Sequence, residues 1–535
     1  MKPYSHYYTI LFFSIIFLLS SSTTKTNRED VLFRGTAKQI PDSAILPDVP
    51  LWTKYGKMFM YAPAFDFDSV KEAVEYKYKL SSASGKVFSF RAKAPNLLLS
   101  PVWEKIPEGR VVLHVIALNK FGDSIALAGS KNFYRSIPFQ GITNSPKRPY
   151  KSAAYLTLDY IFNLPHIQKW VNSTRPDLDY IFYAYPAKII SAAIEGMLLY
   201  SENSRTNKAD SLKAMTIALN MAHHLTSIST SKHPLLRYFA PTYDVEFYNE
   251  RVKDTVQYPP VEHISHVYKV MKKDSHKMML LYGYEYAYML LNLYDRTKDA
   301  KWLHIVKSIA ESYKQLQLSD GSWYLNIDYQ TAEPLSANKL IPGNLLMFYK
   351  KIEKEYGIVG YQDVIDKAEK WIRRNPLKTF DWEGQFEDIA SYDEPYRNLT
   401  KYTPTDYAIY LLRYESSKEN IAIAKELIRF SEDQFVTWGK TEVGYHTPGV
   451  MEQYSYFAVI DASACQMIKA YLEVYKVTKE KEYYRKAETL ANSITEQQQE
   501  NGEIYTVWKE DPNRQNWLNC MVYSANTLMF LDKKK

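Results

Sequence analysis

The sequence predicts a mostly α-helical, multidomain protein in which a small antiparallel β-sandwich precedes an (α/α) toroid of about six helical hairpins. Three observations lead to this fold class. Short runs rich in β-branched and aromatic residues alternate with turn signals between about residues 30 and 140. Beyond about residue 150 the hydrophobic period changes from two to about 3.6 residues, as in amphipathic helices. An internal repeat in this second part indicates that its helices stack as copies of one unit.

Residues 1–24 have the pattern of a secretory signal peptide. Lys2 precedes an apolar run, Ile10–Leu19, which is too short to span a bilayer and leads into small Ser/Thr-rich residues. No cysteine follows that could carry a lipid anchor, so we expect a secreted or periplasmic protein without membrane insertion. The two cysteines, Cys465 and Cys520, are too few for a disulfide framework and lack metal-type spacing. Whether they pair is left open by the sequence.

Residues 25–140 form the predicted β-sandwich. Strand-like runs at 74–80, 87–90 and 111–116 lie between turn signals, a spacing typical of a small antiparallel sandwich. The segment Leu-Ser-Pro-Val-Trp at 99–103, followed by Pro-Glu-Gly at 107–109, resembles a fibronectin type III module. This resemblance implies a spacer, or a wall beside the main site, as such modules provide in secreted glycan-active proteins.

A linker is expected at 141–152, and the toroid at 153–535. The repeat matches residues 294–324 with residues 475–505 at a constant offset of 181 and no gap. In each copy one helix ends, a second helix runs, and an Asx-Gly turn leads into a short extended piece. We count about eleven or twelve helical stretches after residue 150. Long polar loops after alternate helices favour a closed ring, whose loops gather at one mouth, over an open solenoid.

The composition indicates the kind of partner. Aromatic residues make up 15% of the chain, with 46 tyrosines, and an aromatic ring with a polar tip suits sugars as well as interior packing. The net charge of +7 favours a polyanion. Because no dense Lys/Arg stripe appears, the sequence favours an acidic polysaccharide or oligosaccharide over nucleic acid.

The candidate functional residues lie in loops that the helices would hold in place. The sequence has no nucleotide loop, zinc motif, nucleophile elbow or His/Cys cluster. We therefore expect no cofactor, with a structural calcium ion left open. The aromatic and polar loops offer these groups for substrate binding: Asn516, Asn519, Arg397, Trp323, Tyr324, Trp382 and Trp517.

One loop carries a resemblance to a known family. Glu452-Gln453-Tyr454, a helical stretch, and then the segment 470–475 resemble the C-terminal region of glucuronyl epimerases, where Glu-Glu-Tyr precedes a helix ending in Leu-Tyr-Asp. Gln453 departs from the middle position, and Asp461-Ala462-Ser463 replace the Asn-Gly of that family. The wider layout is also similar to toroidal polysaccharide lyases of the ulvan lyase type and to exo-acting glucuronidases.

These resemblances imply chemistry at carbon five of a uronate, whose proton is acidified by the adjacent carboxylate. A base must take this proton while an amide or cation neutralises the carboxylate. We assign Tyr454 or His446 as the base, with Glu452 beside them. Asn516, Asn519 or Arg397 would neutralise the carboxylate.

Export of the protein favours degradation of an external polysaccharide, so the predicted activity is that of a secreted polysaccharide lyase. Its substrate would be a uronate-containing, sulfated glycan such as ulvan or a glycosaminoglycan. Two alternatives stay open. The first is an exo-acting glucuronyl hydrolase, which would need two carboxylates of the kind offered by Asp328, Asp381, Glu383 and Glu452. The second is a non-catalytic glycan-binding protein.

Overall fold

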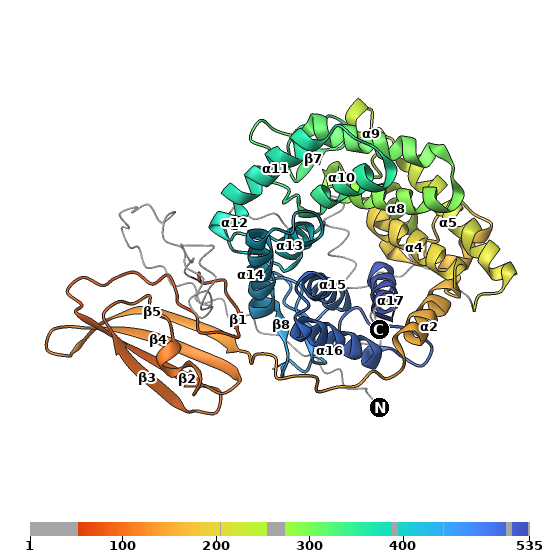
Figure 1. Ribbon diagram of the computed structural model, residues 1–535. Coiled ribbons are helices and arrows are strands. Elements are labelled where there is room, and N and C mark those ends of the chain that lie inside the picture. Colours follow the sequence, from red (N-terminus) through yellow and green to blue (C-terminus); the bar gives the residue numbers. More distant parts are fainter. Residues whose placement is uncertain are drawn as a thin grey trace, which may run out of the picture.

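The computed structural model describes residues 52–203, 205–253, 273–387, 394–441, 443–509 and 516–532. The predicted signal peptide, 1–24, lies outside these residues. A sheet precedes a ring of helices, and both are visible side by side in Figure 1. The predicted class, a mostly helical protein with a small N-terminal β part, is confirmed. Among the described residues, no helix combines the length and the apolar character needed to cross a bilayer.

The N-terminal part is one five-stranded sheet in the order β1-β5-β4-β2-β3. All neighbouring strands are antiparallel except β1 and β5, which are parallel. Along β2 the side chains alternate, with Tyr78 and Leu80 buried and Lys77 and Lys79 exposed, as expected for a sheet with one covered face. The strands are β1 (Met58–Phe59), β2 (Glu75–Ser82), β3 (Val87–Ala92), β4 (Gly109–Leu118) and β5 (Ser124–Arg135).

This sheet differs in one respect from the predicted sandwich. Within the described chain, its apolar face is covered by the short helix α1 (Ser100–Trp103) and by the segment around Phe65, and no second sheet faces it. Trp103 is the main filling residue: it is buried against Phe133 and its indole N–H donates to the carbonyl of Met60 at 3.2 Å. A large indole on a short helix thus takes the place of a facing sheet.

The helical part is a closed double ring. Among the described residues, six inner helices follow one another around an axis, and the last of them, α17, returns to the first, α4. Each inner helix has an outer partner, and the earliest outer helix, α2, packs on α17, so the two ends of the helical part close the ring. The inner helices are α4 (Pro186–Ser201), α8 (Leu281–Thr297), α10 (Gly343–Tyr356), α13 (Tyr402–Tyr414), α15 (Asp461–Thr478) and α17 (Leu518–Asp532).

The outer helices are α2 (Tyr150–Phe162), α5 (Lys208–Ile228), α9 (Ala300–Leu316), α11 (Gln362–Arg374), α14 (Lys418–Phe435) and α16 (Lys481–Gln497). Shorter pieces complete the ring, including α3 (Pro165–Gln168), α6 (Val245–Arg251), α12 (Pro376–Thr379) and the two-stranded ribbons β6 (Lys277–Met279) with β7 (Asn326–Asp328) and β8 (Val436–Thr437) with β9 (Gly449–Val450). The closed ring, rather than the open solenoid, is the arrangement observed.

The sequence repeat corresponds to two hairpins with the same local structure, α8–α9 and α15–α16. Lys298 and Lys479, which are 181 residues apart, both end their inner helix in the left-handed region, at φ 54° and 62°. Gly321 and Gly502 share positive φ values of 94° and 99°. A Cβ at either glycine would lie 2.3 Å or 2.2 Å from a carbonyl oxygen of the neighbouring outer helix, so glycine is required in both copies.

The sheet is joined to the ring through α14. The Asp433 carboxylate at the end of α14 accepts hydrogen bonds from the backbone N–H groups of Met60 and Tyr61, at 2.8 and 3.0 Å. Trp52 stacks on Phe430 with ring centroids 6.0 Å apart. The sheet and the ring therefore share one hydrophobic core.

Candidate active site on the ring axis

The inner helices present a stripe of half-buried side chains at helical spacing. On α8 the stripe includes Glu285 and Tyr288, and on α15 it includes Gln466 and Lys469. Residues three and four apart lie on one helix face, and the other faces pack on neighbouring inner and outer helices. These stripes therefore face the ring axis. The other axis residues used below are Lys188 and Glu195 on α4, Tyr402 and Asp406 on α13, and Tyr523 and Asn526 on α17.

Two carboxyl groups on the axis have strongly perturbed acidity. Burial raises the pKa of Glu285 to about 8; the negative charges of Asp406 and Glu387 also raise it, and Lys188 lowers it. Burial raises the pKa of Asp406 to about 7, although a hydrogen bond from Gln466 opposes this shift. The Gln466 side-chain amide donates to Asp406 Oδ1 at 2.8 Å and fixes the position of that carboxyl. Near neutral pH this arrangement keeps one proton available beside an ionisable partner.

Lys188 lies at the entrance to the axis, in the first turn of α4. Its ammonium group makes a 2.7 Å ion pair with Glu387, whose side chain is fully buried, and the Tyr282 hydroxyl donates to the same carboxylate. The ammonium also lies 4.3 Å from the ring centre of Trp517. Glu387 and Trp517 thus hold this cation in one position.

Lys469 lies further along the axis and has different surroundings. Its ammonium is 5.6 Å from the ring centre of Tyr523 and forms no ion pair with any described residue. Burial raises the pKa of Glu195, while the charge of Lys469 lowers it. Glu195 also accepts a 2.6 Å hydrogen bond from Asn526. Lys469 is therefore a cation on the axis with acids nearby but no bonded counterion.

Glu452, one of the predicted catalytic residues, lies close to the start of α13. Its backbone carbonyl accepts a 2.7 Å hydrogen bond from Lys401, which also donates to Ser463 at 2.6 Å. Burial lowers the pKa of Lys401, and the Glu452 charge partly opposes that change. Burial raises the pKa of Tyr402 well above its usual value, and Glu452 raises it further. The charge of Glu452 thus influences Lys401 and Tyr402 at the start of the inner helix α13.

Tyr454, predicted as the base, is a core residue in this structure. Its side chain is 1% exposed, packs on Phe435, and donates its hydroxyl to Gln434. Burial raises its pKa well above the usual value, as does the nearby Asp433. A hydroxyl enclosed in this way, between the ring and the sheet, has the contacts of a structural side chain.

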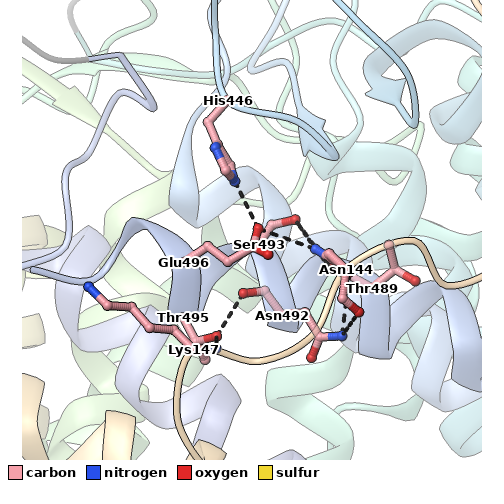
Figure 2. Close-up of polar contacts among 8 residues, drawn as sticks. All are labelled: Asn144, Lys147, His446, Thr489, Asn492, Ser493, Thr495 and Glu496. Carbon is pink, nitrogen blue, oxygen red and sulfur yellow. Dashed lines mark hydrogen bonds and ion pairs between the residues drawn. The ribbon is translucent and has the colours of Figure 1, made fainter.

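His446 lies on the outer ring rather than on the axis. Figure 2 shows its imidazole pointing to Glu496 of α16, with a distance of 3.0 Å between His446 Nε2 and Glu496 Oε2. The same helix binds the predicted linker: Asn144 donates to Ser493 at 3.0 Å, and the Lys147 backbone N–H donates to Thr495. The structure therefore separates His446 from the axis acids and places it in a cluster that fastens the linker.

The two predicted amides have structural contacts. Asn516 bridges its own loop, accepting from the Thr506 backbone N–H at 3.0 Å and donating to Glu503 at 2.8 Å. Asn519 is buried in the first turn of α17 and hydrogen-bonds to the Tyr523 hydroxyl. Of these two, Asn519 is the one coupled to an axis residue.

The predicted aromatic platforms differ in place. Trp323 and Trp382 are fully buried in the core. Tyr324 is half-buried, with the Lys339 ammonium 3.6 Å from its ring centre. Trp517 is at the axis entrance, but Phe182 stacks on it at 4.1 Å while Lys188 covers it as well.

The remaining predicted groups lie in turns and loops between the helices. Arg397 is exposed in a turn ahead of α13. Asp328 caps its own turn by accepting from the N–H groups of Gln330 and Thr331. Asp381 accepts from the Tyr396 N–H at 2.9 Å, and burial raises its pKa to about 6. Glu383 accepts from the side chain of Asn338 at 3.3 Å.

The predicted site residues lie in loops and at helix starts, whereas the axis acids Glu285 and Asp406 lie within helices. A usable signal was present: Glu285 is the only charged residue between Leu281 and Tyr294, and Asp406 is the only one between Tyr402 and Leu412. Lone charges in otherwise apolar, aromatic helices are rarely buried without a partner. Glu285 and Asp406 are therefore candidate functional groups that the sequence pattern indicates.

The two cysteines lie beside a buried carboxyl group. Cys465 and Cys520 are both buried free thiols, and both lie near Asp461 at the start of α15. Burial raises the pKa of Asp461 to about 8. Within the described ranges, no three His, Cys, Asp or Glu side chains gather into a group that could hold a metal ion.

Comparison with known proteins gives structural neighbours only. No family model matches the sequence, and no curated protein matches it. A family 76 glycoside hydrolase from a bovine Bacteroides thetaiotaomicron strain is similar over 92% of this chain and 99% of its own, at 10% identity and a TM-score of 0.46. Cellobiose 2-epimerase from Spirochaeta thermophila is similar over 73% and 99%, at 13% identity and a TM-score of 0.46. An unsaturated glucuronyl hydrolase specific for heparin is similar over 72% and 96%, at 10% identity and a TM-score of 0.43. At these values the neighbours do not determine the reaction of this chain.

Proposed function

We propose that this protein is a carbohydrate-active enzyme that hydrolyses a glycosidic bond at the ring axis, with Glu285 as the proton donor and Asp406 as its carboxylate partner. One observation carries the proposal. Two interacting carboxyl groups, Glu285 and Asp406, lie on the axis, and their pKa values of about 8 and about 7 are close to neutral pH. Most glycoside hydrolases need such a pair, one protonated and one ionised.

The division of roles follows from the surroundings. Glu285, with the higher pKa, keeps its proton at pH 7 and can give it to the glycosidic oxygen as the bond from carbon to oxygen breaks. Asp406 loses its proton more readily and, held by Gln466, can act on the anomeric carbon directly or through a water molecule. Because the two groups interact, the two pKa values describe the pair rather than either residue alone.

The ion pair between Lys188 and Glu387 supports this site from the entrance. Glu387 is fully buried, so its role is to position Lys188 and, through its negative charge, to raise the pKa of Glu285. An ammonium fixed in place costs less side-chain entropy when a ligand binds than a free one does. Lys188 is therefore suited to contact a hydroxyl or anionic group of the sugar.

Elimination at a uronate, the activity expected from the sequence, is the second candidate. One observation favours it: the Lys401 side-chain nitrogen lies 3.6 Å from the ring centre of Tyr402, so a tyrosine base would have an amine beside it. A base must give up its proton near neutral pH, however, and burial raises the pKa of Tyr402 well above its usual value. The acid pair on the axis therefore favours hydrolysis.

The acidic character of the substrate and export of the protein are also proposals. The aromatic content and the charge of +7 support an acidic glycan, and export rests on residues 1–24, outside the described chain. A non-catalytic glycan-binding role would leave the perturbed acidity of the axis pair without a use.

The test is an assay of the full chain on acidic and neutral oligosaccharides. We expect new reducing ends without the ultraviolet absorbance of an unsaturated uronate, and loss of this activity in Asp406→Asn. Glu311→Gln, an exposed acid on the outer helix α9, is the matched control and should be active. Absorbance from unsaturated products would establish elimination instead, and binding without any product would establish a capture protein.

A further inference from the structure

We propose that Lys469 selects the substrate by binding the carboxylate of a uronate, in the sugar bound deepest along the ring axis. The inference rests on the proposed function, because that function places the cleaved bond between Glu285 and Asp406. Binding of the anion by Lys469 can nevertheless be measured without any cleavage. Three observations support the inference. They are the ion pairs of the cations near the axis, the position of Lys469 along α15, and the residues at matching positions of the two repeated hairpins.

The cations whose charges influence Glu285 or Asp406 differ in their counterions. Lys188 is bound to Glu387 at 2.7 Å, and Arg413 is bound to Glu473 at 2.7 Å. Lys469 makes no ion pair with a described residue, although its charge lowers the pKa values of Glu195, Glu285 and Asp406, which lie on three other inner helices. A cation left without a bonded counterion, and with water access, is the one able to gain most from an incoming anion.

The nearby acids do not replace this counterion. Burial raises the pKa values of Glu195, Glu285 and Asp406, so near neutral pH each holds a proton more often than an exposed carboxyl would. Glu195 is further occupied by its 2.6 Å hydrogen bond from Asn526. The face of Tyr523 supports the ammonium without neutralising it. No described carboxylate is therefore bonded to the Lys469 ammonium.

The position of Lys469 fits the far side of a sugar. It follows Gln466, the residue that holds Asp406, by three residues on the same face of α15. At 1.5 Å per residue this places its Cα about 4–5 Å further along the axis than that of Gln466. A sugar whose glycosidic bond lies between Glu285 and Asp406 would then direct its opposite side to Lys469.

The repeat supplies the comparison. The offset of 181 pairs Lys469 of α15 with Tyr288 of α8, whose pKa is raised well above its usual value by burial. The scaffold thus accommodates an uncharged aromatic side chain at this position. A lysine here is not required by the hairpin itself, which is consistent with selection for the ligand.

The experiment is calorimetric titration of the full chain with D-glucuronate, D-glucose and D-glucose 6-sulfate, which differ at carbon six. We expect glucuronate to bind most tightly. Lys469→Met should weaken glucuronate binding about 10- to 100-fold, the usual worth of one charge-assisted hydrogen bond, and leave glucose unchanged. Lys469→Arg should retain most of the preference. Lys476→Met, an exposed lysine on the same helix, is the matched control.

Other outcomes overturn the inference. Equal binding of glucuronate and glucose, an unchanged preference in Lys469→Met, or no binding of any of the three sugars would each exclude the assignment. Tighter binding of the sulfated sugar would exclude a carboxylate as the preferred anion. Because free monosaccharides have no bond to cleave, Lys469-dependent binding by a protein without hydrolase activity would refute the proposed reaction and leave this inference standing.

Discussion

The two repeated hairpins, α8–α9 and α15–α16, have the same local structure but different side chains on the axis. Their helix ends and their Asx-Gly turns correspond residue for residue at an offset of 181, with similar positive φ values. At the matching axis positions, Glu285 and Tyr288 of the first hairpin correspond to Gln466 and Lys469 of the second. In our account, the first hairpin supplies the proton donor, and the second positions the carboxylate partner and receives the anion.

The difference shows how a repeat can keep its scaffold and vary its chemistry. Residues that pack between inner and outer helices, such as Gly321 and Gly502, are constrained by a neighbouring carbonyl in both copies. Axis residues have no such constraint, because they point away from the outer ring. An amide and a carboxyl of equal size can therefore exchange there with little change in packing, and only the ability to titrate differs.

The largest expected effect comes from giving the first hairpin the residue of the second. Glu285→Gln preserves shape but removes the proton, so turnover should fall about 10²–10⁴-fold, the usual contribution of general acid catalysis. The measurement is kcat on a glycoside with a poor leaving group and on one with a good leaving group. The loss should be much smaller with the good leaving group, which needs less protonation. An equal loss with both would mean that Glu285 has another role.

The second effect tests the shared scaffold. Gly321→Ala and Gly502→Ala should each lower the free energy of unfolding by about 1–3 kcal/mol, because alanine is strained at positive φ and its Cβ meets a carbonyl oxygen. Gly357→Ala, at φ 66° with open space around it, is the control and should cost less. Chemical denaturation measures all three. Markedly unequal losses at Gly321 and Gly502 would break the equivalence of the hairpins.

The third effect concerns stability and pH. Burial raises the pKa of Glu285 from 4.5 to about 8, so the folded chain holds a proton there that the unfolded chain releases. Between about pH 4.5 and pH 8 this group therefore lowers stability as the pH rises. Glu285→Gln should remove that part of the loss and be more stable than the wild type at pH 8, by about 1–3 kcal/mol. The same pH dependence in both proteins would show that Glu285 titrates normally.

The smallest effect is expected at Tyr454, outside both hairpins. Its hydroxyl donates to Gln434 within the core. Tyr454→Phe should therefore lower stability by about 1 kcal/mol, the net worth of one hydrogen bond, and leave turnover nearly normal. Denaturation and steady-state kinetics on the same preparation distinguish stability from catalysis. A large fall in turnover with intact folding would restore Tyr454 as the candidate base and contradict our account.

The helical ring could be predicted from the sequence because the apolar residues that build it recur at regular spacings. The change of hydrophobic period near residue 150 and the repeat at an offset of 181 both report local packing, which depends on nearby residues. The sequence also predicts a second sheet facing the first, but hydrophobic periodicity does not show whether a strand is covered by a sheet or by another element. Helix α1, with Trp103, and the segment around Phe65 cover that face.

The site was less predictable because aromatic residues serve both cores and sugar sites. Trp323, Trp382 and Tyr454 are buried, whereas Trp517 lies at the entrance to the axis, and no local pattern separates these cases. The acidity of Glu285 depends on burial by helices far away in sequence. The lone charges in α8 and α13 were nevertheless visible, and the offset of 181 pairs Glu285 with Gln466, the residue that holds Asp406.

The pH dependence of kcat/KM for glycoside hydrolysis tests the roles of Glu285 and Asp406 directly. If the coupled pair of Glu285 and Asp406 performs the reaction, the profile is bell-shaped, with apparent pKa values near 7 on the acid side and near 8 on the alkaline side. Glu285→Gln should lose the alkaline limb, because no proton remains to be removed. An alkaline limb that survives this substitution unchanged would contradict the account.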